Sequence, residues 1–141
     1  WESWRVFLKI KKLMAIIKYH TELKVYQKSF DIAMEIFKIS FKFPNEEKYS
    51  LTDQIRRSSR SVSANISESW GKRRYPKSFV SKLTDAQGEA RETQTWLEYS
   101  FHCNYITEEQ FRIFNEKYNE IIAMIIYMIN NVEKWTNFTS K

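Results

Sequence analysis

Residues 76–103, PKSFVSKLTDAQGEARETQTWLEYSFHC, decide the fold of this chain. Apolar or small residues recur along the segment in alternating steps of four and three, at Phe79, Leu83, Ala86, Ala90, Thr93, Leu97 and Ser100. This spacing is typical of a helix that packs at a shallow angle against its neighbours. Pro76 suits the first turn of a helix, because the N–H that proline lacks has no partner there. The segment therefore predicts one long helix over 76–103.

Two helices are predicted before this segment. The first covers about residues 23–41. Its expected core face consists of Tyr26, Phe30, Ala33, Phe37 and Ser40, and it is widened by Ile32, Ile36 and Ile39. The second covers residues 50 or 51 to 70, with Ser50 as the expected N-cap and Gly71 as its stop signal.

A fourth helix is predicted over about residues 107–135, because Thr107 and Gln110 form a capping-box pattern. Its apolar residues extend more than half-way round the helix: Ile121, Ile122, Met124, Ile125, Ile126, Met128 and Ile129. One stripe facing a neighbour cannot cover them all, so this helix is expected either to lie deep in the fold or to supply a subunit interface.

Composition agrees with an all-α class. The 141 residues include only two glycines and two prolines, whereas 43% are hydrophobic. Strands and long loops need turn residues that this chain scarcely has. We therefore predict an antiparallel up-down-up-down four-helix bundle over residues 22–135, with an N-terminal extension over 1–21 and a C-terminal tail over 136–141.

The extension carries most of the excess charge. Residues 1–20 hold five basic side chains and one acidic one, out of a net charge of +6. Apolar residues at helical spacing between lysines predict an extra helix there, which is either an amphipathic membrane-surface segment or an appended stretch upstream of a natural start at Met14. No apolar run is long enough to span a membrane, and a membrane partner is not expected.

Catalysis is not expected. The single cysteine, Cys103, and the two histidines, His20 and His102, have no spacing typical of a nucleophile site or a metal site. No glycine-rich phosphate loop is present, and no cofactor is predicted. The lone cysteine also predicts a reducing compartment, the cytoplasm.

The best candidates for nucleic-acid binding lie in and after the second helix. They are six basic residues: Arg56, Arg60, Lys72, Arg73, Arg74 and Lys77. Such side chains bind phosphates without reading sequence, and Tyr75 or Trp70 could stack on an unpaired base. The alternative is a basic turn that is merely solvated.

A polar stripe also follows the second helix in steps of three and four, at Gln54, Arg57, Ser61, Asn65 and Glu68. Glu89 and Glu92 on the third helix are suitable partners for Arg57. We expect a network that fixes helix register or joins subunits, and the alternative is a binding site for protein or RNA.

Three separated strings resemble the four-helix bundle proteins of the 23S rRNA intervening sequence family. They are LKVYQK at 23–28, LTDQIRR at 51–57 followed by SVSANISE at 61–68, and EARET at 89–93 followed by Trp96 and Leu97. The resemblance covers about residues 22–135. It departs from the family pattern at Ser69, where glycine is usual.

The resemblance implies a small bacterial protein whose biochemical role is unassigned and whose relatives form homopentameric rings. A related branch, the accessory variability protein of diversity-generating retroelements, binds nucleic acid and a reverse transcriptase. We therefore expect a non-catalytic oligomeric bundle that acts as a binding or scaffold module for RNA, DNA or a nucleic-acid enzyme. The alternative is a purely structural or protein-interaction module.

Overall fold

The computed structural model describes residues 2–6, 8 and 17–136. Four long helices dominate this part of the chain: α2 Lys24–Ser40, α3 Leu51–Gly71, α4 Pro76–His102 and α5 Glu108–Asn130. A short helix, α6 Val132–Thr136, follows α5, and two single turns of 3₁₀ helix lie at His20–Glu22 and Asn45–Glu47. All described regular elements are helical, which confirms the predicted all-α class.

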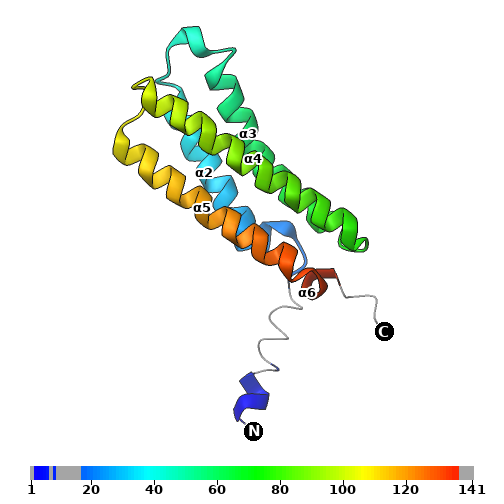
Figure 1. Cartoon of the computed structure of the whole chain (residues 1–141). Coiled ribbons are helices and arrows are strands. Elements are labelled where there is room, and N and C mark those ends of the chain that lie inside the picture. The colour runs from blue at the N-terminus through cyan, green and yellow to red at the C-terminus, as the bar shows by residue number, and fades with distance from the viewer. Residues whose placement is uncertain (1, 7, 9–16, 137–141) are drawn as a thin grey trace.

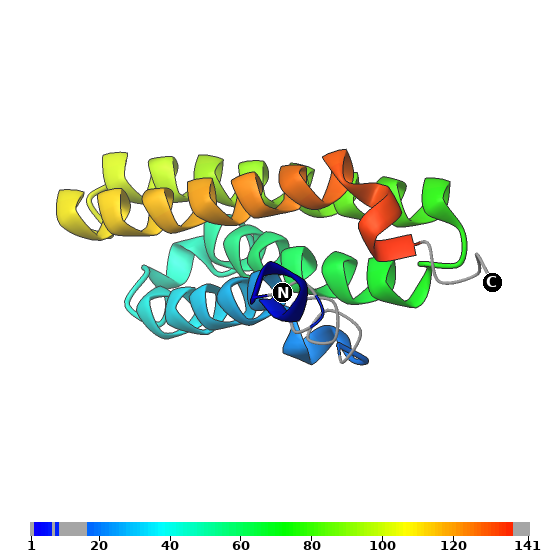
Figure 2. The same ribbon diagram turned by 90° about the horizontal axis from the view of Figure 1, so that it is seen from below.

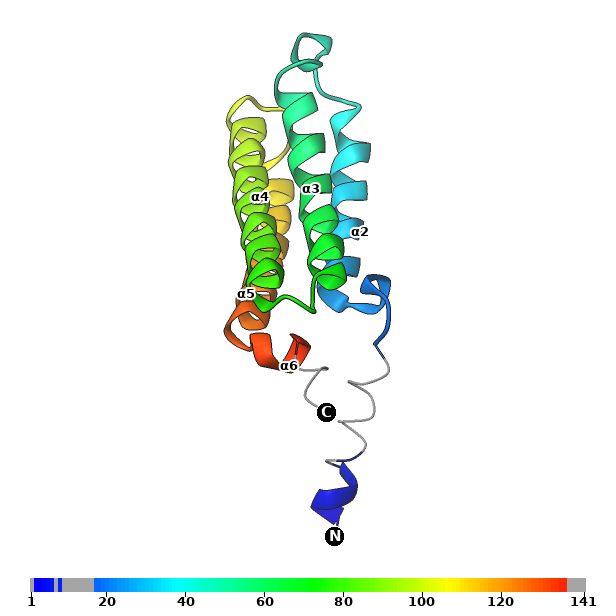
Figure 3. The same cartoon turned by 90° about the vertical axis from the view of Figure 1, so that its right-hand side faces the viewer.

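The long helices lie side by side in two layers, one of α2 and α3 and one of α4 and α5 (Figures 1 and 2). α3 packs most extensively on α4, and further contacts join α2 to α3, α4 to α5 and α2 to α5. Figure 3 shows α2, α3 and α4 in sequence across one side of the molecule. α3 therefore has neighbours on both sides, and its polar residues divide between them.

The core face predicted for α4 is confirmed. All seven of its members are fully buried: Phe79, Leu83, Ala86, Ala90, Thr93, Leu97 and Ser100. They meet Ile55, Val62 and Ile66 of α3 and Ile121 and Ile125 of α5 in one hydrophobic core. Gly71 ends α3, Pro76 begins α4, and Thr107 caps α5 through a reciprocal pair of hydrogen bonds with Gln110.

The core face predicted for α2 is partly wrong. Ala33 and Ser40 are buried, but Phe30 is 47% exposed. Ile32 and Ile36, which were predicted to widen the core face, lie at its centre, together with Val25 and Ser29. The helix carries two apolar faces, and the aliphatic one fills the core.

Two helix ends also differ from expectation. The fourth predicted helix is broken at Asn131, so α5 stops at Asn130 and α6 forms a separate turn. Ser50 stands at the N-cap of α3, but its hydroxyl donates to the Glu47 carboxylate and accepts no hydrogen bond from a backbone N–H of the helix. Residues 2–6 and 8 of the extension are helical, and the rest of the helix predicted there lies outside the described residues.

Candidate functional site

The connector between α3 and α4 carries an exposed basic surface. Lys72, Arg74, Tyr75 and Lys77 are all exposed, and Tyr75 shows 63% of its surface. The sequence has no acidic residue from 69 to 84. The connector lies at the end of the molecule opposite the α2–α3 and α4–α5 connections (Figure 1). We call Lys72, Arg74, Tyr75 and Lys77 the connector surface.

Arg73 has a different environment from its neighbours in the connector. Its Nε donates to the backbone carbonyl of Trp70 at 2.8 Å, and its guanidinium lies 3.8 Å from the centre of the Trp70 ring. Partial burial lowers the pKa of the guanidinium. Arg73 thus folds back on the end of α3, and the structure separates it from the other predicted nucleic-acid residues.

Trp70 is likewise part of the fold. It is buried, its Nε1 donates to the carbonyl of Lys18 at 2.9 Å, and its ring meets the edge of Trp135 at 6.0 Å. Of the two aromatic residues predicted to stack on a base, Tyr75 is the accessible one.

Arg56 and Arg60 lie on a different surface from the connector. The Arg56 guanidinium sits 4.9 Å from the ring centres of Phe37 and Phe41 on α2, and Arg60 sits 5.2 Å from the Phe37 ring. Sixteen residues of helix separate Arg56 from Lys72, a rise of roughly 24 Å. Of the six basic residues predicted as one site, Arg73 folds onto Trp70, and the other five form two surfaces at different levels of the molecule.

The polar stripe of α3 faces α4, and the ion pair that joins the two helices is Lys82 Nζ to Glu68 Oε2 at 2.9 Å. Asn65 donates to the carbonyl of Ser61 on its own helix, and Glu92 accepts from Nε1 of Trp96. Asn65 and Glu92 therefore bind partners within their own helices, and Glu68 binds the neighbouring helix α4. Gln54, near the start of α3, lines a hollow with Trp96 and Tyr99 of α4.

Glu89 is the electrostatically perturbed member of the stripe. Burial and the neighbouring charge of Glu92 raise the pKa of its carboxyl, while the Ser61 hydroxyl and the Arg57 charge act in the opposite direction. The charge of Arg57 thus acts on Glu89, and their pairing through hydrogen bonds stays a prediction. Glu92, the second predicted partner of Arg57, accepts a hydrogen bond from Nε1 of Trp96.

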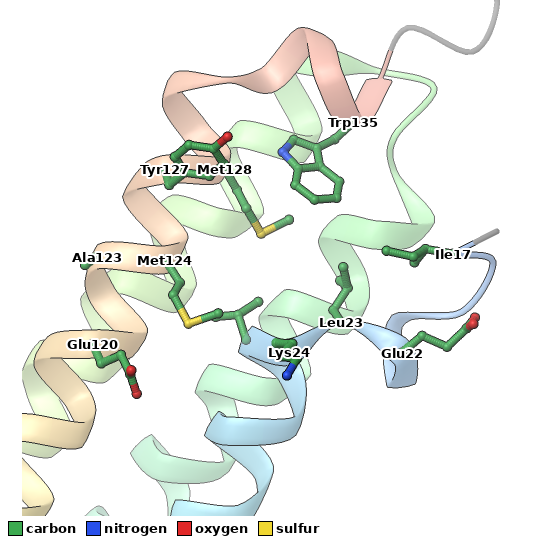
Figure 4. A pocket seen from close by; sticks show the side chains of 11 residues that line it. Ile17, Glu22, Leu23, Lys24, Glu120, Ala123, Met124, Tyr127, Met128 and Trp135 are labelled. Atoms are coloured by element: carbon green, nitrogen blue, oxygen red, sulfur yellow. The ribbon is translucent and has the colours of Figure 1, made fainter. Parts of the chain in front are cut away.

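An apolar cavity of about 470 Å³ lies between the start of α2 and the end of α5 (Figure 4). Its walls include Leu23, Met124, Met128 and Trp135. The charged groups at its rim are largely engaged: Glu120 pairs with Lys28 at 3.1 Å, and Glu22 accepts from two backbone N–H groups. Sequence periodicity could not show this cavity, because it forms where segments distant in sequence meet.

Within residues 2–6, 8 and 17–136, no three His, Cys, Asp or Glu side chains are grouped so as to hold a metal ion. In the same residues, no helix is both long enough and apolar enough to cross a membrane.

A family model for the 23S rRNA-intervening sequence protein matches residues 21–127. A crystal structure of a protein of unknown function, from the S23 ribosomal protein family of Bacteroides thetaiotaomicron, is also similar. It shares 34% sequence identity, covers 76% of this chain and 96% of its own, and superposes with a TM-score of 0.68. No curated protein matches the chain. The extent of the family match shows that this chain belongs to the 23S rRNA-intervening sequence protein family.

Proposed function

We propose that the four long helices form an antiparallel up-down-up-down bundle that assembles with copies of itself and acts as a non-catalytic module for binding RNA or DNA. The observation that carries the proposal is the connector surface, where three cations and an exposed tyrosine gather at one end of the molecule. A scaffold that binds in this way needs no cofactor.

The chemistry of the connector suits a single-stranded nucleic acid. Lysine and arginine attract phosphates whatever the base sequence, and an exposed aromatic ring gives an unpaired base a surface for stacking. Arg73 contributes indirectly, because its contacts with Trp70 fix the turn that displays its neighbours.

Assembly would strengthen this binding. In a ring whose axis follows the helices, every copy presents its connector at the same end, and the positive potentials add. The resemblance to pentameric relatives supports a homopentamer in the bacterial cytoplasm. A reverse transcriptase, the partner of the related retroelement proteins, is the protein partner that the resemblance suggests.

The test is a fluorescence-anisotropy titration of a labelled single-stranded RNA at several salt concentrations. The full chain should bind at low salt, and its affinity should fall as salt rises, because cation–phosphate contacts release counterions. Arg74→Glu/Lys77→Glu should weaken binding and flatten the salt dependence. The matched control is Lys48→Glu/Arg112→Glu, which reverses two exposed charges at the opposite end of the molecule.

Absence of binding at low salt would overturn the nucleic-acid proposal. Equal weakening by the two double variants would show that overall charge, and not the connector, governs the interaction.

The exposed face of α2 favours a second candidate function. α2 exposes the side chains of Phe30, Met34 and Phe41, which their neighbours cover only in part, and such a face favours a purely protein-interaction or structural module. A wild-type chain that assembles with copies of itself but has no affinity for RNA would support this second function.

A further inference from the structure

The outer face of α2 carries a regular apolar row that the fold leaves exposed. Phe30, Met34, Phe37 and Phe41 follow one another in steps of four, three and four, the spacing of a coiled-coil seam. Phe30 is 47% exposed, Met34 42% and Phe41 67%, while Phe37 is partly covered. We call these four residues the α2 seam.

The α2 seam cannot be buried by a small rearrangement within the chain. The opposite face of the same helix already fills the core with Ile32 and Ile36, which are 1% and 0% exposed. A rotation of α2 that buried the seam would expose these isoleucines. None of the described residues can therefore cover the seam while the core stays intact, so its burial takes a further surface.

The surroundings of the seam indicate what that partner carries. Arg56 and Arg60 of α3 lie along one edge, with their guanidinium groups near the rings of Phe37 and Phe41. Lys38, exposed and one helical turn from Met34, lies on the other edge. A complementary surface is thus aromatic or aliphatic along its middle and acidic beside it.

This chain displays such a surface on the outer side of α4. Glu92, Trp96 and Tyr99 are spaced by four and three residues, so they share one face. Tyr99 is 56% exposed and its ring lies 5.8 Å from that of Trp96. Beside Trp96 and Tyr99 is a hollow of about 350 Å³ that reaches the start of α3. We call Glu92, Trp96 and Tyr99 the α4 face.

Further acidic groups extend the α4 face. Glu89 and Asp85 continue it from Glu92 by one and two turns, and the three residues line a second hollow. Burial and the charges of Glu92 and Asp85 raise the pKa of Glu89, while Arg57 acts in the opposite direction. The three carboxylates outnumber this one cation, so a cationic surface of another copy would meet a net negative charge there.

The two surfaces lie on opposite sides of α3 but at the same level along the helix axes. Thr93 of α4 is hydrogen-bonded to Ser58 of α3 at 2.8 Å, which fixes these two residues side by side. Arg56 and Arg60 each lie about 3 Å along the axis from Ser58, and Glu92 and Trp96 lie within about 5 Å of Thr93. Rotation about an axis parallel to the helices preserves these levels, so it would bring Arg60 of one copy to Glu92 of the next.

We propose that the α2 seam of one copy docks on the α4 face of the next, with Arg56 and Arg60 opposite Glu92 and with the phenylalanines against Trp96 and Tyr99. The contact joins two different surfaces, so it repeats from copy to copy and closes when the rotation completes a ring. The inference rests on the proposed assembly of copies and specifies its interface.

Charge reversal tests the interface on the full chain by sedimentation velocity over a concentration series. Arg60→Glu and Glu92→Arg should each raise the dissociation constant of the assembly by about tenfold or more, because each places like charges opposite each other. The double variant should regain most of the lost affinity. Because the two residues lie on opposite sides of α3 in one chain, the recovery would come from contacts between copies.

Two matched controls separate the seam from the other exposed apolar side chains. Phe41→Ser should dissociate the assembly, whereas Ile126→Ser, at an exposed isoleucine on α5, should leave it intact. Arg112→Glu is the corresponding charge control on α5. Circular dichroism of each variant should be unchanged, since every substituted side chain is exposed or lies at the surface.

The outcomes are distinguishable. A wild-type chain that is monomeric at all concentrations would overturn the assembly itself and this interface with it. An assembly that survives Arg60→Glu and Phe41→Ser but is lost with Ile126→Ser would leave the proposed assembly standing and overturn this interface. Loss of RNA binding by Arg60→Glu with the assembly intact would identify the seam as a nucleic-acid surface and also overturn the inference.

Discussion

The hydroxyl of Thr93 on α4 donates a hydrogen bond to the hydroxyl of Ser58 on α3, with 2.8 Å between the oxygens. Both residues are buried among apolar side chains. Thr93 Oγ1 also lies 2.8 Å from the carbonyl of Glu89, whereas the bond from Ser58 to the carbonyl of Ile55 is long, at 3.4 Å. The pair fixes the register of the most extensive helix contact in the structure.

Replacing Thr93 with valine should lower the free energy of unfolding by about 1–2 kcal/mol, because it leaves the buried Ser58 hydroxyl with only its long bond. Urea unfolding of Thr93→Val, Ser58→Ala and the double variant measures this loss. The double variant should be less destabilised than the sum of the single ones, because it removes both polar partners together. Strict additivity would show that the two hydroxyls do not depend on each other.

Tyr118 presents the opposite situation in the same core. Its hydroxyl is buried without a hydrogen bond of ordinary geometry, and burial raises the pKa of the phenol, while the nearby Thr93 hydroxyl acts in the opposite direction. Tyr118→Phe should therefore be neutral or stabilising by up to about 1 kcal/mol, since it removes a desolvated polar group and keeps the ring. Thermal unfolding of this variant checks the expectation, and a clear loss of stability would indicate that the hydroxyl has a partner such as a bound water.

The contrast between α4 and α2 shows what periodicity can predict. α4 has one apolar face, and its seven core residues were all identifiable from their spacing. α2 has two, Phe30 to Phe41 on one side and Ile32 with Ile36 on another, and spacing alone cannot decide which one enters the core. Side-chain packing against α3 and α5 makes that choice, and it is a tertiary property.

The candidate site was predictable to a similar extent. The exposed cations of the connector followed from a basic run next to Gly71 and Pro76. The folding of Arg73 onto Trp70 and the position of Arg56 beside Phe41 depend on rotamers and on neighbouring helices, which sequence spacing does not encode. The break at Asn131 also carried no proline or glycine signal.

The stability of the α2–α3 connection should depend on pH through Glu47. Its carboxylate accepts from the hydroxyls of Ser50 and Tyr105, and these bonds lower the pKa of the carboxyl. The associated stabilisation is present above the pKa of the unfolded chain, about 4.3, and is lost as the pH falls further. The difference in unfolding free energy between wild type and Glu47→Gln should thus be measurable at pH 7 and shrink below about pH 4.

The pKa of Tyr105, the phenol that donates to Glu47, is shifted upward, opposite to that of Glu47. Its hydrogen bond to Glu47 raises the pKa of Tyr105 to about 12. The stabilisation that this hydrogen bond gives the folded chain is present below the ordinary tyrosine pKa of about 10. It is lost as the pH rises toward the pKa of Tyr105 in the folded chain. Ultraviolet difference spectra between wild type and Tyr105→Phe should show this tyrosine ionising after the exposed ones, and early ionisation would contradict the Tyr105–Glu47 hydrogen bond.

Arg73 and Arg74 are neighbours with opposite expected roles. Arg73→Ala should lower the unfolding free energy by about 0.5–1 kcal/mol, because it removes a hydrogen bond and a cation–π contact at the end of α3. Arg74→Ala, at an exposed position, should leave stability unchanged and weaken RNA binding instead. Parallel thermal unfolding and anisotropy titrations measure both effects, and a large loss of stability with Arg74→Ala would contradict its assignment to the connector surface.

Gly88 offers a stabilising substitution within α4. It lies in the interior of a long helix, its φ is not positive, and a Cβ added to it would meet nothing within 4 Å. Gly88→Ala should raise the unfolding free energy of the separated chain by about 0.5–1 kcal/mol, because alanine loses less backbone freedom on folding. Denaturation at concentrations at which sedimentation finds only monomer isolates this effect from the proposed assembly. If the same substitution weakens assembly at higher concentration, the neighbouring copy must approach the helix backbone at Gly88, one turn from Glu92, and the interface on α4 would extend to that turn.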